Sequence, residues 1–487
     1  MNDGIGGIGG IGGIGGIGGI GGIGGIGGID GIDGIDGIRE GQTRRGLLRR
    51  LGWATAGAGL LPALAACGGQ PATQPRALDA NQKDELTWLI IYGDYSPRKD
   101  AYDAMQRRFN QAFPNVTLQR IDMGAEPLEK ITTLMAGGER IDLCGTRPDL
   151  LASFVEGPNP LQDLRAYLKR DTATIKEADH AEGPVAALTW KGTLYALPVG
   201  VYTNVVAVNH DLLEQRGITP PGPNWTVDQM VDIARRVTMR RDTEENSIWG
   251  MHQHWAVITH FPYSWIRGNG GEPLVPNEAI TKAQWSTDAP TVKTVQWLVD
   301  LSQKTGVMPV EPVGAVLGTF REGRTAMGVM EVNNLFLIPQ SQAQGGAQFK
   351  WDVQQLPAME KGRYFPDRGF AYGMARNSKN PDLAWELLKQ VIGPAGQTDW
   401  YRNARFAPSI KSLLNGPYLQ ETDEPKNKRA IVDSILAAKP MPKSPSWWEM
   451  DQGITVKSLA RIRAGAVSVN EGLADLDRQL NAILQRR

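Results

Sequence analysis

The chain has 487 residues and carries 52 basic and 52 acidic side chains, so its formal net charge is zero. This length allows two domains with their own cores. A neutral chain argues against nucleic acid as a partner and against a polybasic membrane patch, because both need a basic surface.

The first part of the chain is a low-complexity extension. From Gly4 to Ile38 it repeats Gly-Gly-Ile and then Asp-Gly-Ile with a period of three. Proline is absent from the repeat, which argues against a collagen helix. Glycine loses the most entropy when it is ordered, so we expect residues 1–42 to form no fold and to have no role.

Residues 43–66 have the pattern of an export signal. Arg44 and Arg45 precede an uncharged, mostly apolar run that ends in Leu-Ala-Ala before Cys67. The run is too short to span a bilayer comfortably, which takes about 20 apolar residues. It resembles a twin-arginine signal followed by a lipobox, which implies cleavage before Cys67 and a lipid on that cysteine. An uncut membrane anchor and export by the general secretory route remain alternatives.

The export signal fixes several further expectations. We expect an extracytoplasmic protein anchored to the bacterial cell membrane by the lipid on Cys67, with residues 67–82 as a flexible tether. Cys144 is then the one cysteine left, so no internal disulfide can form. Because Cys144 lies in an apolar strand pattern, we expect it to be buried and inert.

Strands and helices are expected to alternate after the tether. Apolar runs predict strands at 86–91, 116–121 and 141–144. The spacing of Tyr102, Met105 and Phe109 predicts a helix between the first two strands. This alternation predicts a parallel sheet covered by helices, whose ligands lie beyond the carboxyl ends of its strands.

The second half of the chain repeats this character. Strand-like runs at 192–198 and 205–209 are followed by several helices with clear start signals. Thr226 with Gln229 and Ser468 with Glu471 form capping-box patterns, and Asn380 precedes a helix that begins with proline. A further helix is expected at 291–301, after a Gly-rich turn at 268–271.

The order of these features resembles a known family. The stretches 192–198, 209–213, 224–230, 268–271, 319–327, 380–386 and the closing helix are similar to family 1 extracellular solute-binding proteins, the maltose-binding-protein-like receptors of ABC importers. The resemblance runs from about Leu86 to Leu484. It implies an α/β periplasmic-binding-protein fold of type II, in which two lobes, each a mainly parallel sheet flanked by helices, are joined by hinge strands.

The resemblance also implies the domain boundaries. Lobe 1 would comprise residues 83–198 and 358–404, and lobe 2 residues 199–357 and 405–487. The chain would cross between them near 197–202, 355–357 and 405–408. The ligand would lie between the lobes, which close on it.

Four polar or aromatic positions are implied as ligand contacts. Asp94 and Tyr95 follow the first strand, Asp149 follows the third, and Tyr202 lies at the first crossing. The alternatives are a turn aspartate for Asp94 and a helix N-cap for Asp149. Asn333 stands where relatives often have a stacking tryptophan, so it would bind by hydrogen bonds instead.

Aromatic side chains are expected to provide the face on which a sugar stacks. Relatives have an aromatic pair where Trp447 and Trp448 stand, although the pair could instead pack under its loop. His260, Trp265 and Tyr372 are weaker candidates, and Tyr372 could simply be a strand residue of lobe 1.

The predicted function is that of a lipid-anchored binding protein, not an enzyme, which delivers a mono- or oligosaccharide to the membrane subunits of an ABC importer. We expect a monomer without cofactor or metal, since His252, His254 and His260 have no neighbour that completes a zinc site. One rival is the same fold with a polyol, a peptide or a sugar phosphate as ligand, for which Arg147, Arg368 and Arg405 would form a cationic cleft. The other rival is a surface polysaccharide hydrolase that uses Asp94 and Asp149.

Overall fold

The computed structural model describes residues 78–486, except 92, 94–95, 125, 159, 244–245, 254–259 and 311–314. The Gly-Ile repeat, the export signal and Cys67 therefore lie outside the described residues. From Gly69 onward the chain forms one compact unit. Within the described residues, no helix is both long and apolar enough to cross a membrane.

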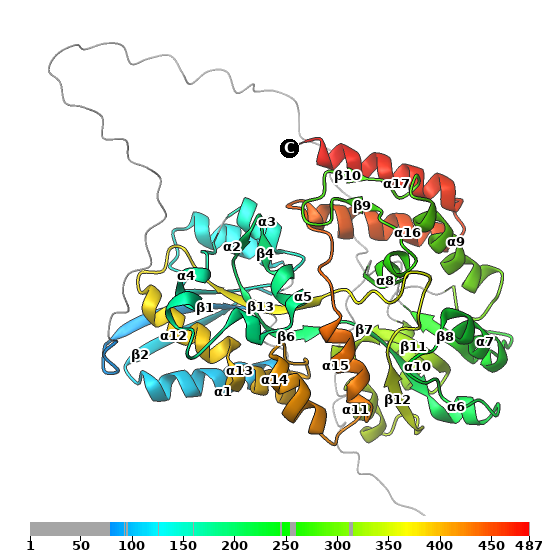
Figure 1. Ribbon diagram of the computed structural model, residues 1–487, viewed down its shortest axis with the longest axis horizontal. Coiled ribbons are helices and arrows are strands. Elements are labelled where there is room, and N and C mark those ends of the chain that lie inside the picture. The colour runs from blue at the N-terminus through cyan, green and yellow to red at the C-terminus, as the bar shows by residue number, and fades with distance from the viewer. Residues whose placement is uncertain are drawn as a thin grey trace, which may run out of the picture. The chain divides into compact units, whose positions relative to one another are not determined.

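Lobe 1 is built on a five-stranded sheet with the order β2-β1-β3-β13-β6 (Figure 1). Its strands are β1 (Asp84–Ile90), β2 (Val116–Asp122), β3 (Leu143–Thr146), β6 (Leu197–Tyr202) and β13 (Arg368–Met374). Strand β1 pairs in parallel with β2 and β3, whereas β13 is antiparallel to β3 and β6. Strand β13, which enters the sheet from the other lobe, is thus the strand that runs against β1, β2, β3 and β6.

Helices cover this sheet as the apolar spacing predicted. Tyr102, Met105 and Phe109 form a fully buried stripe on α1 (Ser96–Ala112). Asn380 caps α12 (Pro381–Ile392), and its Oδ1 accepts a hydrogen bond from the Leu383 amide. The other elements that follow in lobe 1 are α2 (Pro127–Ala136), α3 (Leu151–Glu156), α4 (Arg165–Arg170), η1 (Glu177–Asp179), α5 (Glu182–Ala187), β4 (Thr189–Trp190), β5 (Thr193–Leu194), α13 (Pro394–Asp399) and η3 (Trp400–Ala404).

Lobe 2 is built on a four-stranded sheet with the order β12-β7-β11-β8. Its strands are β7 (Asn204–Asn209), β8 (Trp249–Gln253), β11 (Thr325–Glu331) and β12 (Trp351–Gln354). Only β8 and β11 pair in parallel, while β7 is antiparallel to both of its neighbours. One strand of each sheet, β13 in lobe 1 and β7 in lobe 2, therefore runs against the others, so both sheets are mixed although most of their strands run in one direction.

Both predicted capping boxes are present in the helices of lobe 2. Thr226 with Gln229 starts α7 (Val227–Val237), and Ser468 with Glu471 starts α17 (Val469–Leu484). The helix expected at 291–301 is α9 (Ala289–Gln303). The other elements are α6 (His210–Glu214), α8 (His260–Gly268), β9 (Leu274–Val275), β10 (Lys282–Ala283), α10 (Ala315–Arg321), η2 (Val332–Asn334), α11 (Leu337–Ala343), α14 (Lys411–Leu413), η4 (Leu414–Tyr418), α15 (Lys428–Leu436), η5 (Glu449–Thr455) and α16 (Val456–Arg463).

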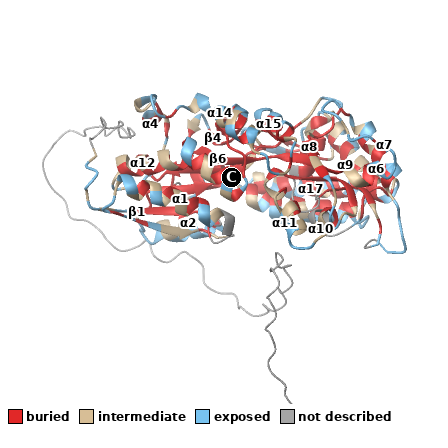
Figure 2. Cartoon of the chain, turned by 90° about the horizontal axis from the view of Figure 1, so that it is seen from below, coloured by how far each residue is buried: buried red, intermediate tan, exposed pale blue. Residues whose placement is uncertain are grey.

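The buried side chains form two clusters. The first is centred on the lobe 1 sheet and extends into lobe 2 through β7, β11, β12 and α15, and the second lies within lobe 2. In Figure 2 the strands are mostly buried, and exposed residues are concentrated on helices and loops. Cys144 is buried as expected, and burial raises the pKa of its thiol.

Backbone contacts of the connecting segments indicate where the chain crosses from one sheet to the other. β6 belongs to the first sheet and β7 to the second, so Thr203 marks the first crossing. Ala358 and Lys361 donate backbone hydrogen bonds to Trp225 and Gly268 of lobe 2. We therefore propose that the second crossing lies at 366–367, later than the expected 355–357.

Candidate functional site

An arginine and an aspartate lie directly after the carboxyl end of β3. Arg147 donates two hydrogen bonds to Asp149, from Nε to Oδ1 at 3.0 Å and from Nη2 to Oδ2 at 2.6 Å. The two side chains are only 10% and 8% exposed. A two-pronged contact of this kind fixes the plane of the guanidinium as well as its position.

The hinge strands bring Tyr202 and Arg368 next to this pair. Arg368 Nη1 lies 3.9 Å from Asp149 Oδ2, and its guanidinium lies 5.8 Å from the centre of the Tyr202 ring. Arg368 is held there because β13 and β6 approach each other closely at Gly369, where a Cβ would collide with the carbonyl oxygen of Gly200. The strand pair thus positions its side chains at the junction of the lobes.

Lobe 2 adds Glu331 and Trp448 to the same place. Glu331 ends β11, and its charge acts on both Arg368 and Tyr202. Trp448 is half-buried, and the Arg147 guanidinium lies over its ring, 5.8 Å from the centroid. We call Arg147, Asp149, Tyr202, Glu331 and Arg368 the hinge cluster.

The charges of the hinge cluster stabilise each other. Burial alone would raise the pKa of Asp149, but the charges of Arg147 and Arg368 hold it well below its usual range. Burial raises the pKa of the Tyr202 hydroxyl, an effect that Arg368 partly opposes. Asp149 is therefore an ionised acceptor at any physiological pH, and it cannot serve as a general acid.

A loop of lobe 2 makes further contacts with lobe 1 beside the hinge cluster. Lys443 Nζ donates to the carbonyl oxygens of Ala186 at 2.7 Å and Thr189 at 2.6 Å. Ser153 Oγ in α3 donates to the carbonyl oxygen of Pro445 at 2.8 Å. Burial lowers the pKa of Lys443 to about 8, although Asp367 and Glu278 counteract this effect. The two lobes are thus in direct contact in this structure.

Four of the predicted ligand contacts lie at or near the junction. Asp149 and Tyr202 belong to the hinge cluster, and Trp448 faces Arg147. Asn333 lies in η2, two residues after Glu331, and its Oδ1 is buried without a hydrogen-bond partner in the protein. Position 149 precedes the N-cap of α3, which is Leu150, so Asp149 does not cap that helix.

Three other predicted contacts are buried inside the lobes. Trp265 is fully buried and donates its indole hydrogen to Gln253 Oε1 at 2.6 Å. Tyr372 is fully buried, and its hydroxyl lies 2.6 Å from that of Tyr102. Trp447 is 3% exposed and belongs to the core cluster of lobe 2.

The remaining candidates have no described side chain. Asp94 and Tyr95 lie outside the described residues, and for His260, the first residue of α8, only the backbone is described. His254 also lies outside the described residues. His252 is buried and hydrogen-bonds Thr319.

Sequence reasoning missed Glu331 and treated Arg147 and Arg368 only as a test for phosphate. Glu331 follows Met327, the end of a stretch that carries the family resemblance, by four residues, and a carboxylate so close to that stretch was a usable signal. The pairing of Arg147 with Asp149 is local in sequence and was also accessible. The position of Arg368 next to Asp149 could not be predicted, because it depends on how β13 inserts beside β3.

Comparisons with known proteins agree with this architecture. The family model described as "Bacterial extracellular solute-binding protein" matches residues 94–398. An erythritol/L-threitol-binding protein of Mycolicibacterium smegmatis is 25% identical over 408 residues, covering 76% of this chain and 82% of its own length. A galactooligosaccharide-binding protein of Bacillus subtilis is 22% identical over 80% of this chain and 86% of its own length.

Solved structures show the same fold. An ABC substrate-binding protein from Listeria monocytogenes in complex with cycloalternan is 19% identical, with a TM-score of 0.69 over 83% of this chain and 100% of its own. Maltose-bound MalE3 of T. maritima is 18% identical, with a TM-score of 0.66 over 82% and 100% of the two chains. The predicted periplasmic-binding-protein fold is therefore confirmed, with two mixed sheets flanked by helices.

Proposed function

We propose that this chain, which belongs to the bacterial extracellular solute-binding proteins, is the binding protein of an ABC importer and holds a carbohydrate between its two lobes. Membership in the family places its work outside the cytoplasm and makes it a binding protein, not an enzyme. The finer parts of the proposal are the ligand, the importer and the lipid anchor.

The ligand proposal rests on the hinge cluster, to which both lobes contribute residues. Asp149 comes from lobe 1, Glu331 from lobe 2, and Tyr202 and Arg368 from the strands between them. A ligand that touches all of them favours the arrangement in which the lobes are together, which is how ligand binding and closure are coupled.

The charge of the hinge cluster supports a neutral ligand. Two arginines are balanced by two carboxylates, and Arg147 is already engaged by Asp149. Arg405, the third arginine that a phosphate-binding cleft would use, is half exposed and pairs with Asp423 at 3.0 Å instead. Hydroxyl groups, which both donate and accept, suit alternating guanidinium and carboxylate groups.

The relatives support the same class of ligand. The printed names of the two curated relatives describe binding of erythritol or L-threitol and of galactooligosaccharides. A further solved relative, from Thermotoga Lettingae, is bound with alpha-D-tagatose. All of these ligands are neutral and rich in hydroxyl groups, which agrees with the balanced charges at the junction.

The lipid anchor is proposed from the lipobox-like end of residues 43–66. A lipid on Cys67 and a tether of residues 68–82 would keep the lobes close to the importer in the same membrane. Replacing Cys67 by Ser should release the protein from the membrane fraction into the soluble fraction. Retention in the membrane fraction would show that another part of the chain anchors it.

A thermal-shift screen tests the ligand proposal. The chain from Gly69 onward is heated with sugars, oligosaccharides, polyols, sugar phosphates and peptides. A ligand that binds only the folded state stabilises it by about 2.7 kcal/mol at one hundred times its Kd. We expect stabilisation by a neutral carbohydrate or polyol. Stabilisation by none of these, or by phosphates alone, would contradict the proposal.

A further inference from the structure

The aromatic rings at the junction of the lobes restrict the shape of the ligand that can bind there. A ring sugar is usually held by an aromatic face against its apolar side. Of the predicted aromatic contacts whose side chains are described, Trp265, Tyr372 and Trp447 are buried within the lobes. Trp448 and Tyr202 are the two that remain at the junction.

Both of these rings are covered by guanidinium groups. Arg147 lies over Trp448 and Arg368 lies over Tyr202, each with its Cζ atom 5.8 Å from the ring centroid. Carbon atoms make contact at about 3.5–4.0 Å, so a sugar ring between a guanidinium and an aromatic ring needs about 7–8 Å. The observed separation is too small for a sugar ring between the guanidinium and the aromatic ring, so this face of each aromatic ring is closed to stacking.

Arg147 is held firmly in its covering position. Its two hydrogen bonds to Asp149 fix the guanidinium, and both side chains are at least nine-tenths buried. Trp448 in turn packs against the first core cluster, which includes residues of both lobes. Moving Arg147 away from Trp448 would separate its buried ion pair with Asp149, and breaking such a pair costs stability.

We propose that Arg147 is a specificity-determining residue, which covers Trp448 and restricts the ligand to a small, open-chain polyol held by hydrogen bonds instead of a stacked sugar ring. This inference rests on the proposed function and narrows its ligand class. Carboxylates at 149 and 331 accept from hydroxyl groups, and the arginines donate to them. Asn333, with its unpartnered Oδ1, offers one further acceptor.

The test compares two probes, erythritol and maltose, by titration calorimetry on the chain from Gly69 onward. We expect the wild-type chain to bind erythritol at least tenfold more tightly than maltose. In Arg147→Ala, erythritol should bind at least tenfold more weakly and maltose at least fivefold more tightly, because the Trp448 face opens. Arg429→Ala, which removes an exposed arginine on α15, is the matched control and should change neither affinity.

A second variant keeps the inference testable if Arg147→Ala does not fold. Trp448→Leu removes the ring itself, and we expect it to change erythritol affinity by less than threefold. A loss of more than thirtyfold in a folded Trp448→Leu protein would show that the ring is a stacking platform and would overturn the inference. Tighter wild-type binding of maltose than of erythritol would also overturn it but would leave the proposed function intact. Binding of no carbohydrate or polyol would overturn both.

Discussion

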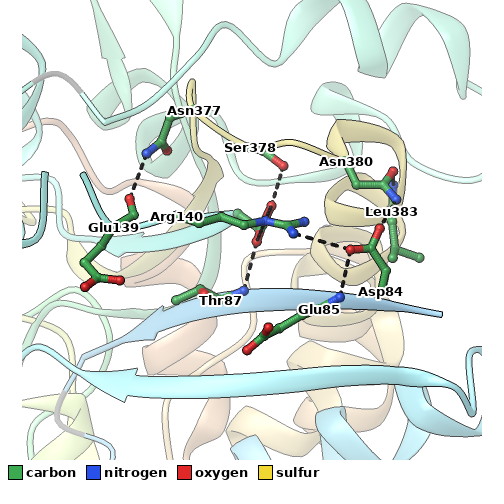
Figure 3. Close-up of polar contacts among 10 residues, drawn as sticks. Asp84, Glu85, Thr87, Glu139, Arg140, Asn377, Ser378, Asn380 and Leu383 are labelled. Carbon is green, nitrogen blue, oxygen red and sulfur yellow. Dashed lines mark hydrogen bonds and ion pairs between the residues drawn. The ribbon is translucent and has the colours of Figure 1, made fainter. Parts of the chain in front are cut away.

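Strand β3 carries an arginine–aspartate pair at each end, with the same spacing in sequence. Arg140 and Asp142 precede the strand, and Arg147 and Asp149 follow it. At the first end, Asp142 is fully buried and accepts hydrogen bonds from the Thr87 amide at 2.9 Å and from Ser378 Oγ at 2.5 Å. All of these partners belong to lobe 1 (Figure 3).

The pair at the other end has partners of a different origin. Asp149 lies near Arg368 of a hinge strand, and Arg147 lies over Trp448 of lobe 2. One pair therefore joins elements within a lobe, and the other joins the two lobes to each other. The same local pattern thus stabilises the fold at the amino end of the sheet and joins the two lobes at its carboxyl end, where we propose that the ligand binds.

The largest effect is expected from Asp142→Asn. The change leaves Arg140 without its buried partner and places an amide where the Thr87 amide and Ser378 hydroxyl donate. Breaking a buried ion pair costs about 3–5 kcal/mol of the free energy of unfolding. Urea denaturation should show this loss. A loss below about 1 kcal/mol would contradict a structural role for the first pair.

Acid sensitivity between about pH 6.5 and pH 4 is expected from His180 in lobe 1. Burial lowers the pKa of His180 to about 4, with a smaller contribution from Lys411, against an ordinary value of about 6.5. Between these two pH values the unfolded chain binds the proton and the folded chain does not. The contribution of His180 to stability is therefore complete above about pH 6.5 and is lost, by up to about 3 kcal/mol, as the pH drops to 4.

His180→Gln tests this assignment. The variant should lack that part of the pH dependence when its free energy of unfolding is measured from pH 7 to pH 4. An unchanged slope would mean that other groups cause the acid sensitivity. Because Asp149 keeps its charge in this window, ligand affinity of a still-folded protein should vary little.

A smaller effect is expected from Asn380→Ala at the first pair's end of the sheet. Asn380 caps α12 and also donates to Asp84, which pairs with Arg140. Loss of a helix cap costs about 1 kcal/mol, and up to about 2 kcal/mol in some hosts. Thermal unfolding should show this loss. A change in ligand affinity at constant stability would instead indicate that Asn380 and Asp84 contribute to ligand binding.

The smallest effect is expected from Ser153→Ala. Ser153 donates to Pro445 of the opposite lobe, so the variant removes one contact between the lobes. A neutral hydrogen bond contributes about 0.5–1.5 kcal/mol, which corresponds to a fall in ligand affinity of about two- to tenfold. Stability of the unliganded protein should hardly change. A clear loss of stability with normal affinity would make the contact part of the fold.

Much of this fold was predictable from local sequence. The capping residues Thr226, Asn380 and Ser468 and the buried stripe of α1 are confirmed, because caps and helical periodicity depend on residues close in the chain. The one reversed strand of each sheet was not predicted, since in lobe 1 the insertion of β13 next to β3 depends on a distant segment. The family resemblance nevertheless indicated the two lobes correctly.

The candidate site was only partly predictable. Asp149 and Tyr202 were implied by the family resemblance, and the structure brings them close to each other at the hinge. Trp447 and Trp448 are adjacent in sequence, yet one lies in the core of lobe 2 and the other faces Arg147, a difference that depends on the direction of each side chain. The covering of both aromatic rings by arginines joins residues far apart in sequence and needed coordinates.

A direct comparison of Asp149→Asn with Asp142→Asn tests whether the ligand binds where Arg147 and Asp149 join the lobes. Calorimetric titration with the strongest ligand from the thermal-shift screen gives the affinity of each folded variant. We expect Asp149→Asn to lose at least tenfold in affinity, while Asp142→Asn loses stability and keeps wild-type affinity. Normal affinity in Asp149→Asn, or an equal loss in both variants, would contradict it.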